Sequence, residues 1–158
     1  MAVKKIRIYD MDGTIVCSMH RYATIIDDNG ERINLTYWRE NSHKAMQDSL
    51  LPLAAKYQMD IENPDVFVVI ATARVLGDRD RQFIREVLGQ PNFIISRKPD
   101  DTRSGGLLKV LGIRQMLGLK QLHNVTDVKF YEDNVSYMKT VCDFFDFTGV
   151  YIPSKQGH

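Results

Sequence analysis

The feature that most constrains this chain is a series of short apolar runs rich in β-branched residues. Five such runs are present, at residues 6–9, 66–70, 93–95, 128–131 and 147–152. Between them lie stretches with apolar residues at helical spacing, at 44–57, 80–88, 107–117 and 135–144. Short buried strands that alternate with helices form crossover units, so the pattern predicts an α/β fold with a central parallel sheet.

Length and composition predict one globular domain over residues 1–158. The chain is 44% hydrophobic and 26% charged, as in an ordinary soluble protein. Its 21 basic and 20 acidic side chains nearly cancel, which argues against a protein that coats duplex nucleic acid. Cys17 and Cys142 show no CxxC spacing, and the start lacks the apolar core of a signal peptide. With no long apolar run either, the sequence predicts a cytoplasmic protein and no membrane partner.

One segment, residues 21–35, breaks the alternation of strands and helices. Its Asp28-Asn29-Gly30 turn signal separates two runs that can pair as a hairpin. A hairpin inserted soon after the first strand would overhang the carboxyl ends of the strands, where such sheets bind ligands. We therefore expect a small flap and one helix in an insert of about 16–65, with a minimal cap over an open site. Aromatic side chains in or near the flap either stack a base or pack the hairpin; they are Tyr22, Tyr37 and Trp38.

Two carboxylates stand directly after the first apolar run, in the segment Tyr-Asp-Met-Asp-Gly-Thr at 9–14. Asp10 and Asp12 would raise each other's pKa unless a cation lay beside them. Mg²⁺ is the natural candidate, because it takes oxygen ligands and binds through one or two carboxylates together with substrate phosphate. The alternative is a polar turn after a strand.

Three further groups of polar residues follow strands or begin helices. Thr72 and Arg74 end the run at 66–70 and suit a phosphate, although Thr72 also fits a helix cap. Lys109 lies in the first turns of a helix, where a solvated lysine is common. Glu132 and Asp133 follow the fourth run and could simply favour a helix N-terminus. A single parallel sheet would gather all of these groups along one edge.

Together, Asp-x-Asp-Gly-Thr, Thr-x-Arg, a lysine and a late acidic pair resemble the haloacid dehalogenase (HAD) superfamily of phosphotransferases. The resemblance runs from residue 6 to about 137 and implies a Rossmann-like three-layer sandwich. It implies that Asp10 is the nucleophile that forms an aspartyl-phosphate and that Asp12 is the general acid and base. By the same resemblance Thr72 and Lys109 hold the phosphoryl oxygens.

The resemblance also implies a bound Mg²⁺. Its ligands would be the carboxylate of Asp10, the backbone carbonyl of Asp12 and a late acid. Asp133 is the expected late ligand, and Glu132 is the alternative.

A narrower resemblance appears in the segment 97–103, Arg-Lys-Pro-Asp-Asp-Thr-Arg. Together with Arg74, Arg97 and Arg103 resemble the phosphatase half of phage-type polynucleotide kinase/phosphatases, which removes 3′-phosphates from nucleic-acid ends and nucleotides. Two departures are present: Glu-Asp-Asn replaces a late Asp-Asp-Arg, and the family lysine could align further along the helix, at Arg114 or Gln115. Alternatively, Arg97 and Arg103 are loop charges paired with Asp100 or Asp101.

These observations predict a Mg²⁺-dependent phosphomonoesterase that acts through an aspartyl-phosphate on 3′-phosphorylated nucleic-acid ends or on nucleotides. Two alternatives stay open. One is a HAD phosphatase of another small phosphoester, and the other is a catalytically silent binding domain of the same fold.

Overall fold

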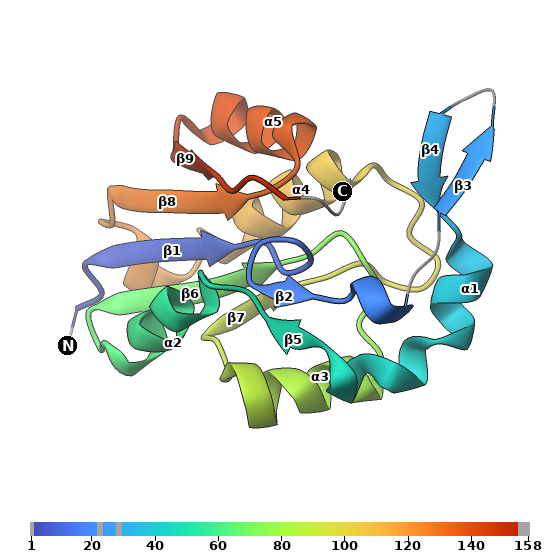
Figure 1. The fold of residues 1–158 in the computed structure, drawn as a ribbon. Helices are drawn as coiled ribbons and strands as arrows, with labels where there is room; N and C mark the ends of the chain where they lie inside the picture. Colours follow the sequence, from blue (N-terminus) through green and yellow to red (C-terminus); the bar gives the residue numbers. More distant parts are fainter. Residues whose placement is uncertain (1, 22–23, 28–29, 155–158) are drawn as a thin grey trace.

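The computed structural model describes residues 2–21, 24–27 and 30–154. A five-stranded parallel sheet forms its centre (Figure 1). In spatial order its strands are β7 (Phe93–Ile95), β6 (Val66–Ala71), β1 (Lys5–Tyr9), β8 (Asp127–Glu132) and β9 (Thr148–Tyr151). All five predicted strands are confirmed. β6 is buried along its whole length, as expected for an inner strand covered on both faces.

Helices cover both faces of the sheet and complete the predicted three-layer sandwich (Figure 1). One face carries α4 (Gly105–Met116) and α5 (Val135–Phe145), and the other carries α2 (Ala54–Glu62) and α3 (Asp78–Phe83). α3 continues into a wider helical turn at Ile84–Leu88. Among the described residues, no helix has the length and apolar character needed to cross a membrane.

The side chains of β1 alternate between two hydrophobic cores. Ile8 packs with Ile113 in the core beneath α4 and α5. Tyr9 packs with Tyr57 and Phe83 in the core beneath α2 and α3. This alternation follows from the two-residue period of a strand, and it decides which helix layer each polar residue beyond the strand end can reach.

The insert lies beyond the carboxyl ends of the central strands (Figure 1). It contains β2 (Val16–Cys17) paired with β5 (Ser49–Leu50), the hairpin of β3 (Thr24–Asp27) and β4 (Gly30–Ile33), and α1 (Leu35–Glu40). The antiparallel hairpin confirms the predicted flap. The turn residues Asp28 and Asn29, and the aromatic Tyr22, lie outside the described residues.

The prediction of one helix over 44–57 is wrong. A short 3₁₀ segment at Ser42–Gln47 is followed by β5, and α2 begins only at Ala54. Pro52 explains the break, because proline cannot donate a backbone hydrogen bond and disfavours helix at the preceding residue. The short helix α1 was not expected; the Asn34 side chain caps it by accepting from the Tyr37 backbone N–H at 3.1 Å.

Candidate active site

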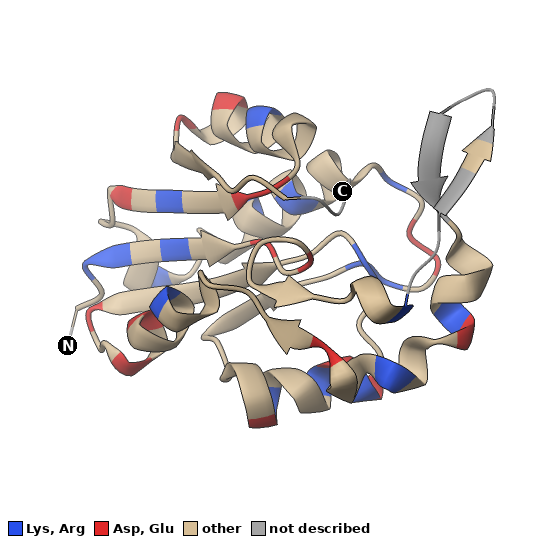
Figure 2. Ribbon diagram, viewed as in Figure 1, with Lys and Arg blue, Asp and Glu red and all other residues tan. Residues whose placement is uncertain are grey.

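Polar residues from four segments meet at the carboxyl edge of the sheet. Figure 2 shows acidic segments at the ends of β1 and β8. Asp10 follows β1 directly, and its backbone N–H donates to the Tyr131 carbonyl of β8 at 2.9 Å. Glu132 ends β8 and Asp133 follows it, so that three buried carboxyl groups lie within 4.8 Å of one another. The predicted convergence of these acids is therefore present.

Lys109 is the cation of this cluster. It is fully buried, and its Nζ donates to Asp10 Oδ1 at 2.8 Å and to Glu132 Oε1 at 2.6 Å. Burial acts to lower the pKa of Lys109, but the two carboxylates outweigh it and hold that pKa above its usual value. Arg114 and Gln115 lie exposed further along α4, whereas Lys109 is buried against the two carboxyl groups.

The position of Lys109 depends on how closely α4 approaches α5. A Cβ added at Gly105 would collide with the ring of Tyr137 on α5. The Ser104 side chain caps the helix by accepting from the Leu107 backbone N–H at 3.3 Å. A glycine at the start of α4 therefore lets the helix pack tightly and aim Lys109 at the strand ends.

The carboxyl groups titrate differently because their surroundings differ. Burial opposes ionisation of Asp10, yet the charge of Lys109 brings its pKa below the usual value. Burial raises the pKa of Glu132 to about 9, and burial together with the neighbouring Asp10 raises that of Asp133 to about 8. One lysine cannot neutralise three carboxylates, so the site has the electrostatics of a divalent-cation centre.

Asp133 and Glu132 differ in how their oxygens are used. Glu132 Oε1 accepts from Lys109, and Oε2 accepts from the backbone N–H of Asp133 at 3.0 Å. Both carboxylate oxygens of Asp133 are buried and lack a hydrogen-bond partner within the described part of the chain. Buried acceptors without donors are costly, and a hard cation would satisfy them. Asp10 and Asp133 therefore fit Mg²⁺, whereas Glu132 anchors Lys109.

Gly13 makes room for Asp133. Its φ of +81° lies in the left-handed region, and an added Cβ would collide with the Asp133 carboxylate. The glycine of the Asp-x-Asp-Gly motif thus serves both the turn and the close approach of the late acid.

One threonine contacts Asp10, and a second follows the neighbouring strand β6. The Thr14 hydroxyl donates to Asp10 Oδ2 at 2.9 Å, so both oxygens of Asp10 are held in place. Thr72 is buried just beyond β6, and its backbone N–H donates to the Ile95 carbonyl at 2.9 Å. Its Oγ1 accepts from the backbone N–H of Arg74 at 3.4 Å, which orders the turn after the strand.

Asp12 is held separately from Asp10. Its Oδ1 accepts from the Ser18 hydroxyl at 2.9 Å, and its Oδ2 lies 2.7 Å from Arg74 Nε. Arg74 also pairs with Asp80 at 2.8 Å, and its side chain is only 12% exposed. The predicted phosphate-binding Arg74 is thus engaged by two carboxylates.

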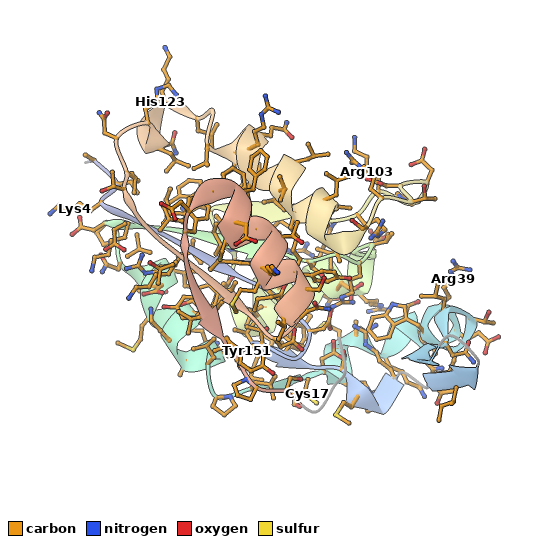
Figure 3. The ribbon with its side chains drawn as sticks, turned by 90° about the horizontal axis from the view of Figure 1, so that it is seen from above. Lys4, Cys17, Arg39, Arg103, His123 and Tyr151 are labelled. Atoms are coloured by element: carbon orange, nitrogen blue, oxygen red, sulfur yellow. The ribbon has the colours of Figure 1, made fainter. Side chains whose placement is uncertain are left out.

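The two arginines of the loop before α4 behave differently. Arg97 donates to three backbone carbonyls, namely those of Ala73 at 2.6 Å, Asp101 at 2.8 Å and Arg103 at 2.6 Å. Arg103 pairs with Asp101 at 2.5 Å and is about half exposed, beside the start of α4 (Figure 3). Arg97 therefore ties this loop to the turn after β6, and Arg103 faces solvent.

An apolar hollow of about 450 Å³ borders the loop that carries Asp10. Its walls come from the loop, from the start of α2 and from the segment after β9: Gly13, Thr14, Leu51, Pro52, Leu53, Ile152 and Pro153. This hollow could receive an apolar or planar part of a substrate next to the reacting group.

The sequence matches the family described as "Bacteriophage T5 5'-deoxynucleotidase" over residues 1–99, which is more than half of the chain. The chain belongs to this family. The matched stretch carries Asp10, Asp12, Thr72 and Arg74 and ends before Lys109. Lys109, Glu132 and Asp133 lie outside the matched stretch, and the structure places them beside Asp10.

A 5'-deoxynucleotidase of Escherichia phage T5 is 31% identical to this chain over 87 residues. The match covers 53% of this chain and 35% of that protein, so it spans about a third of that relative's length.

Solved structures with much lower sequence identity share the fold. A chain of the Pnkp1/Rnl/Hen1 RNA repair complex is 16% identical, with 98% of this chain and 44% of that chain covered and a TM-score of 0.61. The HAD domain of effector protein Lem4 from Legionella pneumophila is 14% identical, with 98% and 88% covered and a TM-score of 0.61. CbbY from Rhodobacter sphaeroides, solved in complex with phosphate, is 11% identical, with 100% and 90% covered and a TM-score of 0.63. The HAD-like fold predicted from the motifs is confirmed.

Sequence reasoning missed several residues that support the site. Arg21, Asp48 and Asp80 form buried ion pairs behind Arg74. Only Asp80 carries a local signal, because an acid three residues after Gly77 is typical of a helix start, and its Oδ2 indeed accepts from the Gly77 N–H at 2.9 Å. That signal indicates a cap and gives no sign of a link to Arg74.

Proposed function

We propose that this protein is a phosphomonoesterase that removes phosphate from nucleotides, with Asp10 as its nucleophile. The observation that carries the proposal is the state of Asp10: its two oxygens are held by Lys109 and Thr14 while Asp133 lies beside it. A carboxylate whose pKa is lowered by a buried lysine stays ionised and fixed in orientation, as a nucleophile requires.

In the first step, an Asp10 carboxylate oxygen forms a bond to phosphorus while the bond from phosphorus to the leaving oxygen breaks. Asp12 donates a proton to that oxygen, which leaves as an alcohol. In the second step, Asp12 takes a proton from water as the water attacks the aspartyl-phosphate, so that inorganic phosphate leaves and Asp10 is regenerated. Lys109 and the Thr72 hydroxyl would stabilise the charge on the phosphoryl oxygens.

Mg²⁺ suits this site, held by the carboxylates of Asp10 and Asp133 and by the backbone carbonyl of Asp12. When bound, the ion supplies the positive charge that lets an anionic nucleophile approach an anionic phosphate. The residues of the chain hold Asp10 in a fixed orientation, present Asp12 for proton transfer and keep Glu132 paired with Lys109.

A nucleoside monophosphate is the substrate class that we favour. The name of the phage T5 relative points to 5′-deoxynucleotides, and the apolar hollow beside Gly13 and Thr14 offers a surface for a base or sugar. The 3′-phosphorylated nucleic-acid end is the second candidate, favoured by the resemblance of Arg97 and Arg103 to polynucleotide phosphatases. Both substrates require the same chemistry at Asp10.

The test is a panel of 5′- and 3′-phosphorylated nucleosides and oligonucleotides, with p-nitrophenyl phosphate as a generic phosphoester, each assayed with and without Mg²⁺. Asp10→Asn is the matched control, because the amide has the same shape but cannot act as the nucleophile. We expect Mg²⁺-dependent release of phosphate from nucleotides by the wild type and none by Asp10→Asn.

Three results would contradict the proposal. Turnover by a folded, undeamidated Asp10→Asn variant would remove the nucleophile assignment. Activity toward p-nitrophenyl phosphate alone would favour another small phosphoester as substrate. Binding of nucleotides without any turnover would favour a silent binding domain.

A further inference from the structure

A buried chain of alternating charges leads from the insert to Asp12. Arg21 is fully buried, and its Nε and Nη2 donate to the two carboxylate oxygens of Asp48, each at 2.9 Å. Arg21 Nη2 also donates to Asp80 Oδ1 at 3.0 Å. The same Asp80 oxygen accepts from Arg74 Nη1 at 2.8 Å. Asp80 therefore lies between two guanidinium groups and is shared by both.

Arg74 connects this series of buried ion pairs to Asp12, the candidate proton donor. Its Nε lies 2.7 Å from Asp12 Oδ2, on the side of the carboxyl group that Ser18 does not hold. Asp80 is itself fixed at the start of α3, because its second oxygen accepts from the Gly77 backbone N–H. Asp12, the candidate proton donor, is thus linked through Arg74 to Asp80 at the start of α3. Asp80 in turn pairs with Arg21.

Trp38 of α1 covers the two arginines. The guanidinium carbon of Arg21 lies 4.2 Å from the centre of the Trp38 ring, and that of Arg74 lies 5.2 Å from it. Stacking of this kind favours a fixed orientation of each guanidinium plane. Trp38 is the only tryptophan in the chain, so tryptophan fluorescence reports on the surroundings of this ring, which include both guanidinium groups.

We infer that Asp80 is a positioning residue for the reaction: by neutralising Arg21 and Arg74 together, it holds Arg74 in the orientation that presents the Asp12 carboxyl group. The inference rests on the proposed phosphatase activity. Without the Asp80 charge, two adjacent buried guanidinium groups would repel each other, and Arg74 would lose one of its two carboxylate partners. Repulsion from Arg21 would then displace the Arg74 guanidinium from its place beside Asp12, leaving Ser18 as the only side chain that donates a hydrogen bond to Asp12 within the described residues.

The chemistry gives this role a kinetic signature. A nucleoside alkoxide is a poor leaving group and needs the proton from Asp12, whereas p-nitrophenolate leaves without one. General acid catalysis is worth roughly a hundredfold or more where it is needed. Misplacing Asp12 should therefore lower kcat/KM, which reports the phosphorylation step, by about ten- to a hundredfold for a nucleotide and by less than about threefold for p-nitrophenyl phosphate. Hydrolysis of the aspartyl-phosphate also uses Asp12 but is common to both substrates, so it does not enter this comparison.

The experiment compares Asp80→Asn with Asp48→Asn. The Asp48 variant removes the other carboxylate partner of Arg21 but leaves the contact between Arg74 and Asp80, so it is the matched control for a buried carboxylate lost from the same ion-pair chain. We expect a selective loss of kcat/KM for the nucleotide in Asp80→Asn only, together with a changed emission of Trp38. Asp80→Glu restores the charge on a longer side chain and should recover part of the loss. If Asp80→Asn does not fold, the same measurements are made on Asp80→Glu, which should show a smaller loss of the same selectivity.

The inference is overturned if Asp80→Asn lowers kcat/KM equally for both substrates, or if Asp48→Asn shows the same selectivity, because either result describes a general structural effect. It is also overturned if Trp38 emission is unchanged in a folded Asp80→Asn variant. The fluorescence measurement does not need turnover, so it separates failure of this inference from failure of the proposed function.

Discussion

Replacing Lys109 with methionine should be among the most damaging single changes in the molecule. Methionine keeps most of the length of the side chain, being one heavy atom shorter, but removes the charge that two buried carboxyl groups share. The raised pKa of Lys109 means that its contribution is fully present below the usual lysine value and is lost only as the pH rises through the higher folded-state pKa. At pH 8 the wild-type protein therefore keeps the whole contribution.

The expected size follows from the burial of all three groups. Removing one partner of a buried ion pair costs about 3–5 kcal/mol, because the other partner is left charged and desolvated. Lys109 has no exposed surface, and its partners Asp10 and Glu132 are also buried, so solvent cannot take its place. The total stability of a domain is about 5–15 kcal/mol, so this change would remove a large part of it.

Urea denaturation at pH 8 followed by circular dichroism measures this loss. Arg114→Met is the matched control, since it removes a positive charge from an exposed position of the same helix and should cost less than about 0.5 kcal/mol. Adding Glu132→Gln to Lys109→Met should recover part of the loss, because one stranded carboxyl group is then gone. If Lys109→Met and Arg114→Met have the same free energy of unfolding, Lys109 does not stabilise the buried carboxylates, and the reasoning is refuted.

Three further outcomes are expected. Asp133→Asn should raise the Mg²⁺ concentration needed for activity more than Glu132→Gln does; a metal titration in which the order is reversed would make Glu132 the ligand. Because the pKa values of Glu132 (about 9) and Asp133 (about 8) are raised, the folded protein retains protons that the unfolded chain has released. The stability of the metal-free protein should therefore fall as the pH rises from about 4.5 to 9, and Mg²⁺ should raise the melting temperature more at pH 9 than at pH 6; equal shifts at both pH values would speak against a metal that displaces these protons. Arg97→Ala should lower the rate of hydrolysis of nucleotides and of p-nitrophenyl phosphate equally, because it releases the loop from the turn after β6. Arg103→Ala should lower only the rate of hydrolysis of phosphorylated oligonucleotides, by about tenfold. An unchanged rate would show that Arg103 is a loop charge that does not contact the substrate.

Most of the central fold could be predicted because its signals are local. Each strand is a short apolar run, and four of the motifs stand at strand ends or helix starts, so the sheet topology brings them together. The insert was predicted less well. Its helix boundaries depend on Pro52 and on contacts with distant residues, such as the Asp48 carboxylate held by Arg21, rather than on the spacing of apolar side chains.

The site shows the same division between local and distant effects. Asp10 and Asp12 could be singled out as candidates because two acids directly after a strand repel each other unless a cation lies beside them. Arg21 and Asp80 could not, because each stands in a segment that reads as an ordinary polar turn or helix start. Their importance arises only when the fold brings them together, although they are 59 residues apart in the sequence, so that Arg21 donates to the carboxylate that Asp80 also offers to Arg74.

Strand periodicity explains why the two late acids have different partners, a point the sequence left open. Along β8, Phe130 faces the core beneath α4 and α5, and Tyr131 faces the opposite core. By the two-residue period, Glu132 continues on the side of Phe130 and meets Lys109 from α4. Asp133 comes after the strand, next to Gly13, with its oxygens unpaired within the described residues. Asp10 obeys the same rule, because it follows Ile8 at an interval of two and therefore also faces Lys109. The lysine thus holds the two acids that share its side of the sheet, and Asp133, the acid outside that pairing, is the one that we propose as a metal ligand.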